Sequence, residues 1–500
     1  MKKIISMILA LATVVSFCFA FTACGKDDGN DTGNNGDTGN NGDTGNNGDT
    51  GNNGDTVTVN THAEYVAAEV GTPLVIEAYV QAKQSWWDNK AVIYLQDENG
   101  GYFAYNLPIS EADYNKLVIG QKVRISGKKA NYRGQHEIDD PEATYEILDG
   151  NWKATATDVT AYLGTDDLIK YQGQLASFKG LVVVPSYDAE GNEKDWMYNW
   201  NGAGDEGNDL YFSVTDGKNV YSFTVESYLC NKDSDVYKAV KELKVGDNIN
   251  AEGFLYWYDT VNPHITSVTV TAKAADVHAK AEGTMTYETY AATELNESVT
   301  VEAFVQAKQS WWDNKAVLYL QDQDGAYFVY NLPISEEDYN KLVIGQKVRI
   351  SGKKIAYRGE FEISDPEATY EILNGKWFAT ATDVTEILGS DDLINHQNKF
   401  VSFKGLTVVA SENADGEELP WMYNWNGAGD EGNDLYFTVS DGTNTYSFTV
   451  ESYLCDKDSD VYKTVKTIKI GDVLDMEGFL YWYDGVNPHI TSVTIRPVAE

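Results

Sequence analysis

Tryptophan and tyrosine are the residues whose type and placement best suit ligand chemistry in this 500-residue chain, which holds 12 Trp and 33 Tyr. Many of them stand in short segments between apolar runs, such as Trp86-Trp87, Tyr132-Arg133, Trp196 to Trp200 and Trp257-Tyr258. Aromatic rings in loops stack on sugar rings or on nucleic-acid bases, and one base contact is worth about 1–3 kcal/mol. The same rings also close barrel ends or pack one domain against the next. We expect at least one of these clusters to be a ligand-contact surface.

The predicted contact residues form two sets of ten, and the second set repeats the first. The first set is Trp86, Trp87, Tyr132, Arg133, Trp196, Tyr198, Trp200, Trp257, Tyr258 and His264. The second set is Trp311, Trp312, Tyr357, Arg358, Trp421, Tyr423, Trp425, Trp482, Tyr483 and His489. Neighbouring side chains of an extended chain point to opposite sides, so one of Trp86 and Trp87 is expected in a core. Neither His264 nor His489 has a Cys or His at metal-ligand spacing, so we expect each to be a hydrogen-bonded histidine.

An acidic loop offers oxygen atoms at a spacing that suits Ca²⁺. Its carboxylates are Asp205, Glu206 and Asp209, with the copies Asp430, Glu431 and Asp434. The loop lacks the EF-hand pattern, so a structural calcium ion is the alternative to a solvated acidic loop.

The chain has many Asp and Glu residues, the residue types that glycoside hydrolysis uses, but no pattern singles out a catalytic pair. Because the chain has no Ser/His/Asp set, phosphate loop, HExxH or dinucleotide fingerprint, we expect a binding protein without a cofactor, not an enzyme.

The charge balance opposes a polyanionic partner. Asp and Glu number 77 against 38 Lys and Arg, which gives a formal net charge of −39. Nucleic-acid affinity comes largely from Lys and Arg that replace phosphate counterions. With only five arginines in the chain, no basic stripe is expected, and nucleic acid is a disfavoured ligand.

The chain contains a long internal duplication. The segments 80–92, 196–212 and 221–230 recur unchanged 225 residues later. Such an offset defines two repeats, and each of them divides again into two modules. The predicted parts are a leader (1–23), a tether (24–56), module A1 (57–150), module B1 (151–272), a connector (273–283), module A2 (284–375) and module B2 (376–500).

Each module shows the same order of expected elements, β-β-β-α-β-β. In module A1 the expected strands are 75–82, 91–96, 102–105, 120–127 and 137–148, with a helix at 110–118. In module B1 they are 176–184, 209–215, 220–229, 248–258 and 264–270, with a helix at 234–243. Ser110 and Ser234 stand at the N-cap positions of the helices. A string of immunoglobulin-like sandwiches is the rival architecture, but it would lack the helix before strand four.

This order of elements, together with three short sequence segments, resembles tandem oligonucleotide/oligosaccharide-binding (OB) domains of bacterial lipoproteins. The segments are Leu95-Gln-Asp-Glu-Asn-Gly100, Gly120-Gln-Lys-Val-Arg-Ile-Ser-Gly127 and Asn262-Pro-His-Ile265. The resemblance implies a mainly β protein of four tandem five-stranded barrels. In that fold, ligands cross strands two and three and are held by the loops that join strands 1–2 and 4–5.

The N-terminal residues predict a secretion signal. Lys2 and Lys3 precede an apolar run, and Phe21-Thr22-Ala23-Cys24 resembles a lipoprotein lipobox. The resemblance implies cleavage before Cys24, diacylation of Cys24, and attachment to the outer side of a bacterial envelope membrane. An uncleaved transmembrane anchor is the alternative. The Asp-Thr-Gly-Asn-Asn-Gly repeats that follow predict a flexible tether.

These observations support three functions. The leading hypothesis is a lipid-anchored binding protein whose loop aromatics contact a glycan or a similar polar ligand. The second is a structural or protein-interaction lipoprotein that takes no small ligand. The third is extracellular binding of single-stranded nucleic acid, which the fold permits and the charge opposes.

Overall fold

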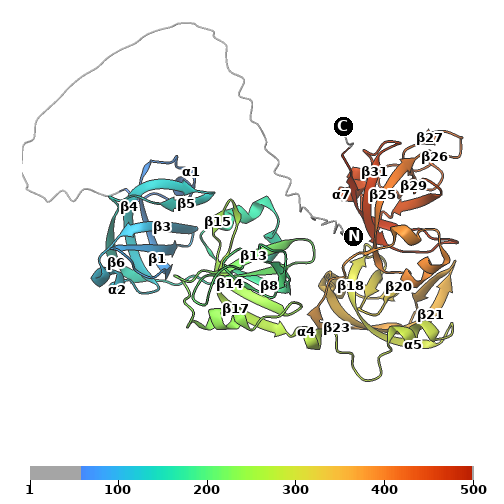
Figure 1. Cartoon of the computed structure of the whole chain (residues 1–500), viewed down its shortest axis with the longest axis horizontal. Coiled ribbons are helices and arrows are strands. Elements are labelled where there is room, and N and C mark those ends of the chain that lie inside the picture. Colours follow the sequence, from blue (N-terminus) through green and yellow to red (C-terminus); the bar gives the residue numbers. More distant parts are fainter. Residues whose placement is uncertain (1–57, 498–500) are drawn as a thin grey trace, which may run out of the picture. The chain divides into compact units, whose positions relative to one another are not determined.

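The computed structural model describes residues 58–497. The predicted leader, lipidated Cys24 and tether therefore lie outside the described residues. Within 58–497, no helix combines the length and the apolar character that a membrane crossing requires. The described chain consists of four barrels, two in each repeat (Figure 1).

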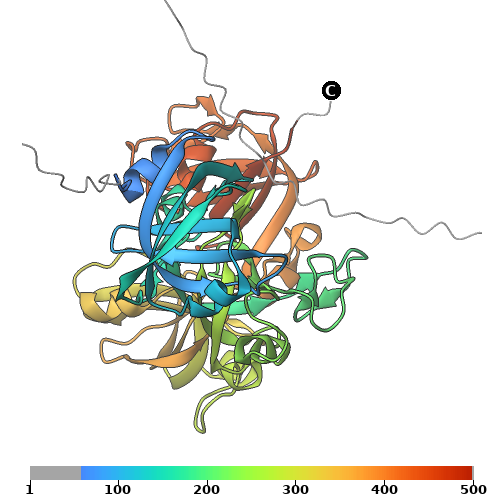
Figure 2. The ribbon, with the colours of Figure 1, turned by 90° about the vertical axis from the view of Figure 1, so that its left-hand side faces the viewer.

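Module A1 is a closed five-stranded barrel. Its elements are α1 (His62–Ala67), β1 (Pro73–Lys83), β2 (Lys90–Gln96), β3 (Gly101–Pro108), α2 (Glu111–Lys116), β4 (Gln121–Tyr132), β5 (Gln135–Ile138) and β6 (Thr144–Asn151). The strands pair in the order β1-β2-β3-β5-β4, and β4 pairs back onto β1. Figure 2 shows these strands, in blue to teal, from a second direction. This closure is the strand order of the OB fold.

The fifth predicted strand of module A1 was wrong in one respect, because the structure divides the segment 137–148 in two. Strand β5 ends at Ile138, and β6 starts again at Thr144 and runs back along β4. Between them, the amide of Ala143 donates to the carbonyl of Asp140 at 3.0 Å. Pro141 lies inside this turn and has no amide N–H to offer a ladder, which ends the strand.

Module B1 is a second barrel of the same order. Its main elements are β8 (Leu175–Val184), β12 (Leu210–Thr215), β13 (Val220–Val225), α3 (Asp235–Lys241), β14 (Asn248–Phe254) and β17 (His264–Ala272). Pairing of β12 with β8 closes the ring β8-β12-β13-β17-β14. Its short elements are β7 (Thr157–Asp158), η1 (Thr160–Tyr162), η2 (Asp166–Tyr171), β9 (Ser186–Tyr187), β10 (Glu193–Lys194), β11 (Met197–Tyr198), β15 (Trp257–Tyr258) and β16 (Thr260–Val261).

The second repeat has the same architecture, after the connecting helix α4 (Ala274–Val277). Module A2 comprises α5 (Tyr287–Ala292), β18 (Ser298–Lys308), β19 (Lys315–Gln321), β20 (Ala326–Pro333), α6 (Glu336–Lys341), β21 (Gln346–Tyr357), β22 (Glu360–Ile363) and β23 (Thr369–Lys376). Module B2 comprises β24 (Thr382–Asp383), η3 (Thr385–Ile387), η4 (Asp391–His396), β25 (Phe400–Val409), β26 (Ser411–Glu412), β27 (Glu418–Leu419), β28 (Met422–Tyr423), β29 (Leu435–Ser440), β30 (Thr445–Val450), α7 (Asp460–Val465), β31 (Val473–Phe479) and β32 (His489–Ile495). Four tandem OB-like barrels, as predicted, make the chain mainly β.

The helix before strand four begins as the sequence predicts. The Ser110 hydroxyl accepts from the amide of Asp113, and Ser234 accepts in the same way from Tyr237. Ser335 and Ser459 repeat this cap in the second repeat. An N-cap hydroxyl satisfies an amide that has no partner inside the helix, which is worth about 1 kcal/mol. These four helices exclude the immunoglobulin-like alternative.

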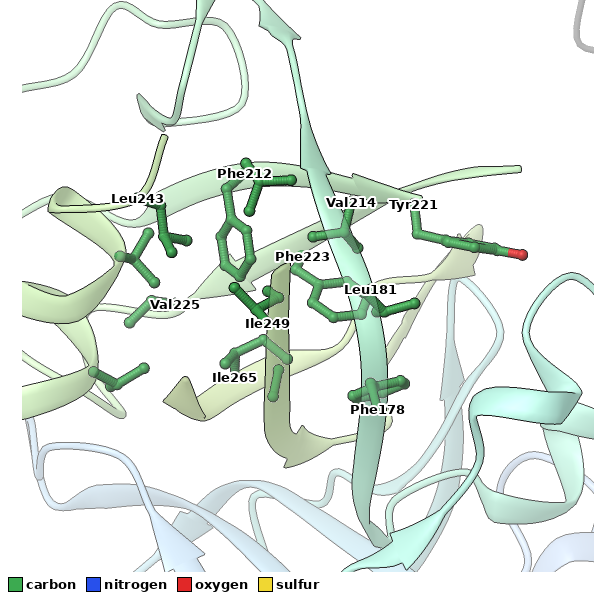
Figure 3. Close-up of a cluster of buried hydrophobic side chains, with 14 of the residues drawn as sticks. Phe178, Leu181, Phe212, Val214, Tyr221, Phe223, Val225, Leu243, Ile249 and Ile265 are labelled. Atoms are coloured by element: carbon green, nitrogen blue, oxygen red, sulfur yellow. The ribbon is translucent and has the colours of Figure 1, made fainter. Parts of the chain in front are cut away.

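Alternation along the strands builds the cores. In module B1, Phe178, Phe212, Phe223 and Ile249 are fully buried and point toward one another inside the barrel (Figure 3). Gly253 lets strand β14 bend, since a Cβ there would lie 2.3 Å from the carbonyl oxygen of His264. The ladder shifts register at this residue. A glycine at the bend therefore permits barrel closure.

Candidate ligand-binding face

The strand-two and strand-three face of module A1 is covered by module B1. Its outward side chains Val92, Tyr94 and Phe103 are buried. The Tyr94 ring lies 4.7 Å from the ring of Phe254, and Phe103 lies 5.5 Å from Tyr256. In module A2, Val317, Tyr319 and Phe328 pack in the same way on Phe479 and Tyr481. We call this contact the barrel seam. Most of the OB ligand face of each A module is therefore covered, and only its margin, at Tyr105 and Tyr330, is exposed.

The two predicted histidines lie in the barrel seam. The hydroxyl oxygen of Tyr94 and Nδ1 of His264 are 2.7 Å apart, and Tyr319 and His489 make the same contact at 2.7 Å. Burial lowers the pKa of each histidine to about 3, so the imidazole is neutral at neutral pH. These are the hydrogen-bonded histidines that the sequence indicates.

The predicted aromatics of the A modules also serve packing. Trp86 joins the core of module A1 and donates from Nε1 to the carbonyl of Ile109 at 2.9 Å, whereas Trp87 joins the seam. The expected opposite orientation of this pair is therefore observed. Trp311 and Trp312 repeat the arrangement, with Trp311 donating to Ile334.

In each repeat, the loops that join strands four and five of the two barrels pack against each other. The Arg133 guanidinium carbon lies 4.2 Å from the ring centre of Tyr258, and its Nη1 donates to the Tyr258 hydroxyl at 2.7 Å. Arg133 also forms an ion pair with Asp259. Tyr132 contacts the Tyr258 ring at 6.0 Å. The copies Tyr357, Arg358 and Tyr483 are arranged alike, and Arg358 is paired with Asp484. Both arginines are thus engaged within the protein.

The corresponding face of module B2 is open and forms a hollow of about 640 Å³. We call it the B face. Its lining residues are Trp425, Tyr436, Ser447, Tyr481, Tyr483, Val486, Asn487 and His489. Tyr436 and Ser447 belong to β29 and β30, and Trp425 lies in the loop between strands one and two. His489 begins β32, and the other four residues lie in the connection between β31 and β32. This is the place where the OB fold holds its ligands. All eight residues have identical counterparts in module B1.

Within the 1–2 loop, one aromatic is presented to solvent while two hold the loop in place. Trp425 is 74% exposed, and its counterpart Trp200 is 73% exposed. Trp196 instead packs on the module B1 core, donates from Nε1 to the carbonyl of Lys241 at 3.0 Å, and meets Tyr198 at 5.1 Å. Asn199 adopts a φ of 56°, a left-handed conformation that asparagine tolerates, just before Trp200.

The second copy of the loop repeats this geometry. Trp421 and Tyr423 pack on the module B2 core and meet at 5.1 Å, and Asn424 precedes Trp425 with a φ of 55°. Trp257 and Trp482 pack on the cores of their barrels. Trp200 and Trp425 are therefore the predicted tryptophans best placed to meet a ligand.

The polar groups of the B face are uncharged. Asn487 accepts through Oδ1 from the hydroxyl of Thr449 at 2.7 Å, which fixes its amide nitrogen as a donor. Among residues 58–497, that nitrogen has no hydrogen-bond acceptor. Burial raises the pKa of Tyr436, so its phenol stays protonated. With His489 neutral, none of the eight lining residues carries a charge at neutral pH.

The second repeat has a second aromatic-lined hollow, between modules A2 and B2. This hollow of about 350 Å³ is lined by Gln309, Trp312, Tyr330 and Tyr453. Between the two hollows lies the buried Phe328 ring, 5.2 Å from the ring of Tyr481 and 6.4 Å from the ring of Tyr330. The second repeat thus has a second aromatic-lined hollow near the B face.

The predicted carboxylates of the acidic loop do not come together as a set of calcium ligands in the described residues. Glu206 forms an ion pair with Lys241 at 2.7 Å, and Asp209 accepts from both the amide and the hydroxyl of Ser227. The copies Glu431 and Asp434 are engaged with Lys466 and Ser452 in the same way, and Asp205 and Asp430 begin the two loops. Throughout the described part of the chain, no three His, Cys, Asp or Glu side chains are placed to hold a metal ion.

Five of the eight lining positions of the B face were missing from the predicted contact set. They are Tyr436, Ser447, Tyr481, Val486 and Asn487, with the counterparts Tyr211, Ser222, Tyr256, Val261 and Asn262 in module B1. The alternation Leu210-Tyr-Phe-Ser-Val214 signals that Tyr211 points outward, because Leu210, Phe212 and Val214 are the buried residues of β12. The role of Asn262 depends on its contact with Thr224, 38 residues away, which no local pattern reveals.

Comparisons with known proteins identify no relative in sequence. No family model matches the chain, and no curated protein matches it. Among solved structures, it is similar to the Ifi202 HINa domain in complex with 20-bp dsDNA, with 10% identity, a TM-score of 0.15, and coverage of 40% of this chain and 95% of that one. A murine DNA binding protein bound with dsDNA gives 12% identity, a TM-score of 0.17, and coverage of 41% and 98%. A Replication Protein A heterotrimer bound to ssDNA has 11% identity and a TM-score of 0.15, with coverage of 65% of this chain and 94% of that one. TM-scores this low carry no inference about the ligand of this chain.

Proposed function

We propose that the chain is a binding protein whose modules B1 and B2 each hold a neutral or weakly charged glycan on the B face. The observation that carries the proposal is the uncharged hollow of about 640 Å³ in module B2 with the exposed Trp425 beside it. Small-molecule sites typically have volumes of about 300–1,000 Å³ and combine aromatic side chains with a few polar groups. The identical residues in module B1 give the chain two such faces.

A sugar suits this face because it has both an apolar and a polar side. The C–H side of a pyranose ring stacks on an aromatic ring, and Trp425 and Tyr483 are exposed for such contact. The hydroxyl groups of the sugar bond with the Asn487 amide nitrogen and the hydroxyls of Tyr436 and Ser447. An uncharged ligand meets no electrostatic cost here, because the lining residues are uncharged and the chain carries −39 overall.

Single-stranded nucleic acid is the second candidate. Its supporting observation is that the open face combines strands two and three with loop aromatics, on which bases also stack. Its phosphates would find little compensation, because the nearby Arg358 is already paired with Asp484. Binding through phosphates requires Lys and Arg that release counterions. Charge therefore ranks this ligand below a glycan.

We further propose that the four barrels are displayed outside the cytoplasm on a lipid attached to Cys24. The support is the sequence of residues 1–56, with its lipobox-like segment and its polar repeats. Metabolic labelling with a palmitate analogue tests the anchor. We expect label on the wild-type chain and none on Cys24→Ala, and equal labelling of the two would refute it.

Affinity electrophoresis through gels that contain a neutral polysaccharide tests the proposed ligand. We expect the wild-type chain to be retarded and the Trp200→Ala/Trp425→Ala variant to migrate freely. Tyr187→Ala is the matched control, because Tyr187 is 57% exposed, does not line the hollow, and has Glu412 as its counterpart. If a panel of neutral glycans causes no retardation, the glycan proposal fails. Retention on single-stranded DNA that falls steeply with salt would instead support the second candidate.

A further inference from the structure

The first repeat contains another hollow, of about 420 Å³, beside helix α1 and apart from the B faces. We call it the α1 hollow. Its apolar wall includes Val66 and Ile169, which are 43% and 45% exposed. Its polar wall includes His62, His136 and Gln172. It belongs to module A1 on one side and to η2 of module B1 on the other.

The two repeats differ sharply at the α1 hollow. Seven of its ten lining residues are different at the positions 225 residues later, whereas all eight lining residues of the B face are the same. Tyr287 replaces His62, and Phe361 replaces His136. Since the two copies are otherwise nearly identical in many segments, the exchange gives the first repeat a polar hollow of its own.

The contacts of His136 make it a hydrogen-bond donor. Its Nδ1 lies 2.7 Å from the ammonium nitrogen of Lys129, which has only protons to offer. Nδ1 therefore accepts, and the ring proton is on Nε2. Burial and the positive charge of Lys129 lower the pKa of His136 to about 4, which keeps the ring neutral.

The contacts of His62 make it a hydrogen-bond acceptor. Its Nε2 lies 3.1 Å from the carbonyl oxygen of Gly101, and a carbonyl only accepts. Nε2 therefore carries the proton and Nδ1 carries a free lone pair. Burial lowers the pKa of His62, so this ring is also neutral at neutral pH.

The other polar groups of the hollow are already engaged. The Gln172 side chain accepts from the amide of His136 at 3.1 Å and donates to the carbonyl of Gly134 at 2.9 Å. Lys170 is paired with Asp167 at 2.6 Å. The hollow thus offers one imidazole donor and one imidazole acceptor beside an apolar wall, without an unpaired charge on its lining residues.

We propose that the α1 hollow binds a small uncharged ligand that carries a secondary amide, such as the acetamido group of an N-acetylated sugar. The amide N–H donates to Nδ1 of His62, the amide carbonyl accepts from Nε2–H of His136, and the methyl group packs on Val66 and Ile169. The assignment is independent of the proposed function, because none of these residues lines the B face.

The test is a titration of the full chain with N-acetylglucosamine, followed through the ¹⁵N signals of the imidazole rings. The chain has six histidines, so the rings of His62 and His136 are individually assignable. Glucose is the matched probe, since it lacks the amide. We expect N-acetylglucosamine to shift both rings with a Kd on the order of 1 mM, and glucose to leave them unchanged.

The His62→Tyr/His136→Phe variant installs the residues that the second repeat carries at the same positions, so the barrel is expected to accept them. Because this variant lacks both rings, its binding is followed through the backbone amide signals of the hollow, and it should weaken at least tenfold. Ile169→Glu, which places a charge on the exposed wall, should also weaken it and serves if the double variant unfolds. Trp200→Ala/Trp425→Ala should leave the two imidazole shifts intact. Equal shifts with glucose, or unchanged binding in the wall and imidazole variants, would overturn the proposal.

Discussion

Glu360 is the buried carboxylate whose replacement tests the electrostatics of the fold most cleanly. Its side chain has no exposed surface, and although Oε2 accepts from the amide of Trp482 at 2.9 Å, Oε1 has no partner among the described residues. Burial raises its pKa from 4.5 to about 8. At the same position the first repeat has Gln135, which donates to His136 and accepts from Trp257. We predict that Glu360→Gln stabilises module A2 increasingly as the pH rises.

The sign and size follow from proton linkage. Between pH 4.5 and about 8 the folded protein keeps a proton on Glu360 that the unfolded chain has lost. The free energy of unfolding therefore falls by up to about 1.4 kcal/mol per pH unit in this window. Glutamine does not titrate, so the advantage of the variant grows with pH. Relative to pH 5, we expect an additional gain on the order of 3 kcal/mol at pH 8.

Hydrogen-exchange mass spectrometry in moderate urea measures this effect, because it reports the two repeats separately. Protection of β22 peptides should be higher in Glu360→Gln than in the wild type at pH 8, and nearly equal at pH 5. The reciprocal change Gln135→Glu should lower the protection of β5 as the pH rises. Other buried acids are common to both proteins and cancel in the comparison. A gain that is the same at pH 5 and pH 8 would refute the reasoning.

Two further predictions concern packing. Tyr94→Phe removes the phenol that meets His264 in the barrel seam and leaves Nδ1 unpaired, so unfolding of the first repeat should become easier by about 1–3 kcal/mol in urea. Tyr132→Phe is its control, since Tyr132 is 52% exposed, and should change stability by less than about 0.5 kcal/mol; equal effects would contradict the seam. Trp196→Ala should cost about 2–3 kcal/mol by calorimetry because the indole packs on a core and bonds Lys241, whereas Trp200→Ala should be neutral. A costly Trp200→Ala would show that its ring is structural.

Much of the fold is readable from local sequence. Serines at 110 and 234 followed by acids predict the helices, and alternation along the strands predicts the barrels, because both signals arise within a few residues. The break after Ile138 has a local signal in Pro141, but the residue at which β6 begins depends on its pairing along β4, which no local pattern gives.

The candidate site was only partly predictable. Trp87 and Trp200 look alike as loop tryptophans, yet the first lies in the seam and the second is 73% exposed. The difference arises because one barrel covers the ligand face of the other, a tertiary contact that leaves no local pattern. The α1 hollow was missed for the same reason, since His62 and His136 lie in different elements and meet through the fold.

The central claim, that each repeat presents one glycan-binding B face, is tested most directly by the stoichiometry of binding. Isothermal titration with a neutral oligosaccharide that retards the chain in affinity gels should give two equivalent sites per wild-type chain. Trp200→Ala and Trp425→Ala should each leave one site, and the double variant none. Two undiminished sites in a folded double variant would contradict the account.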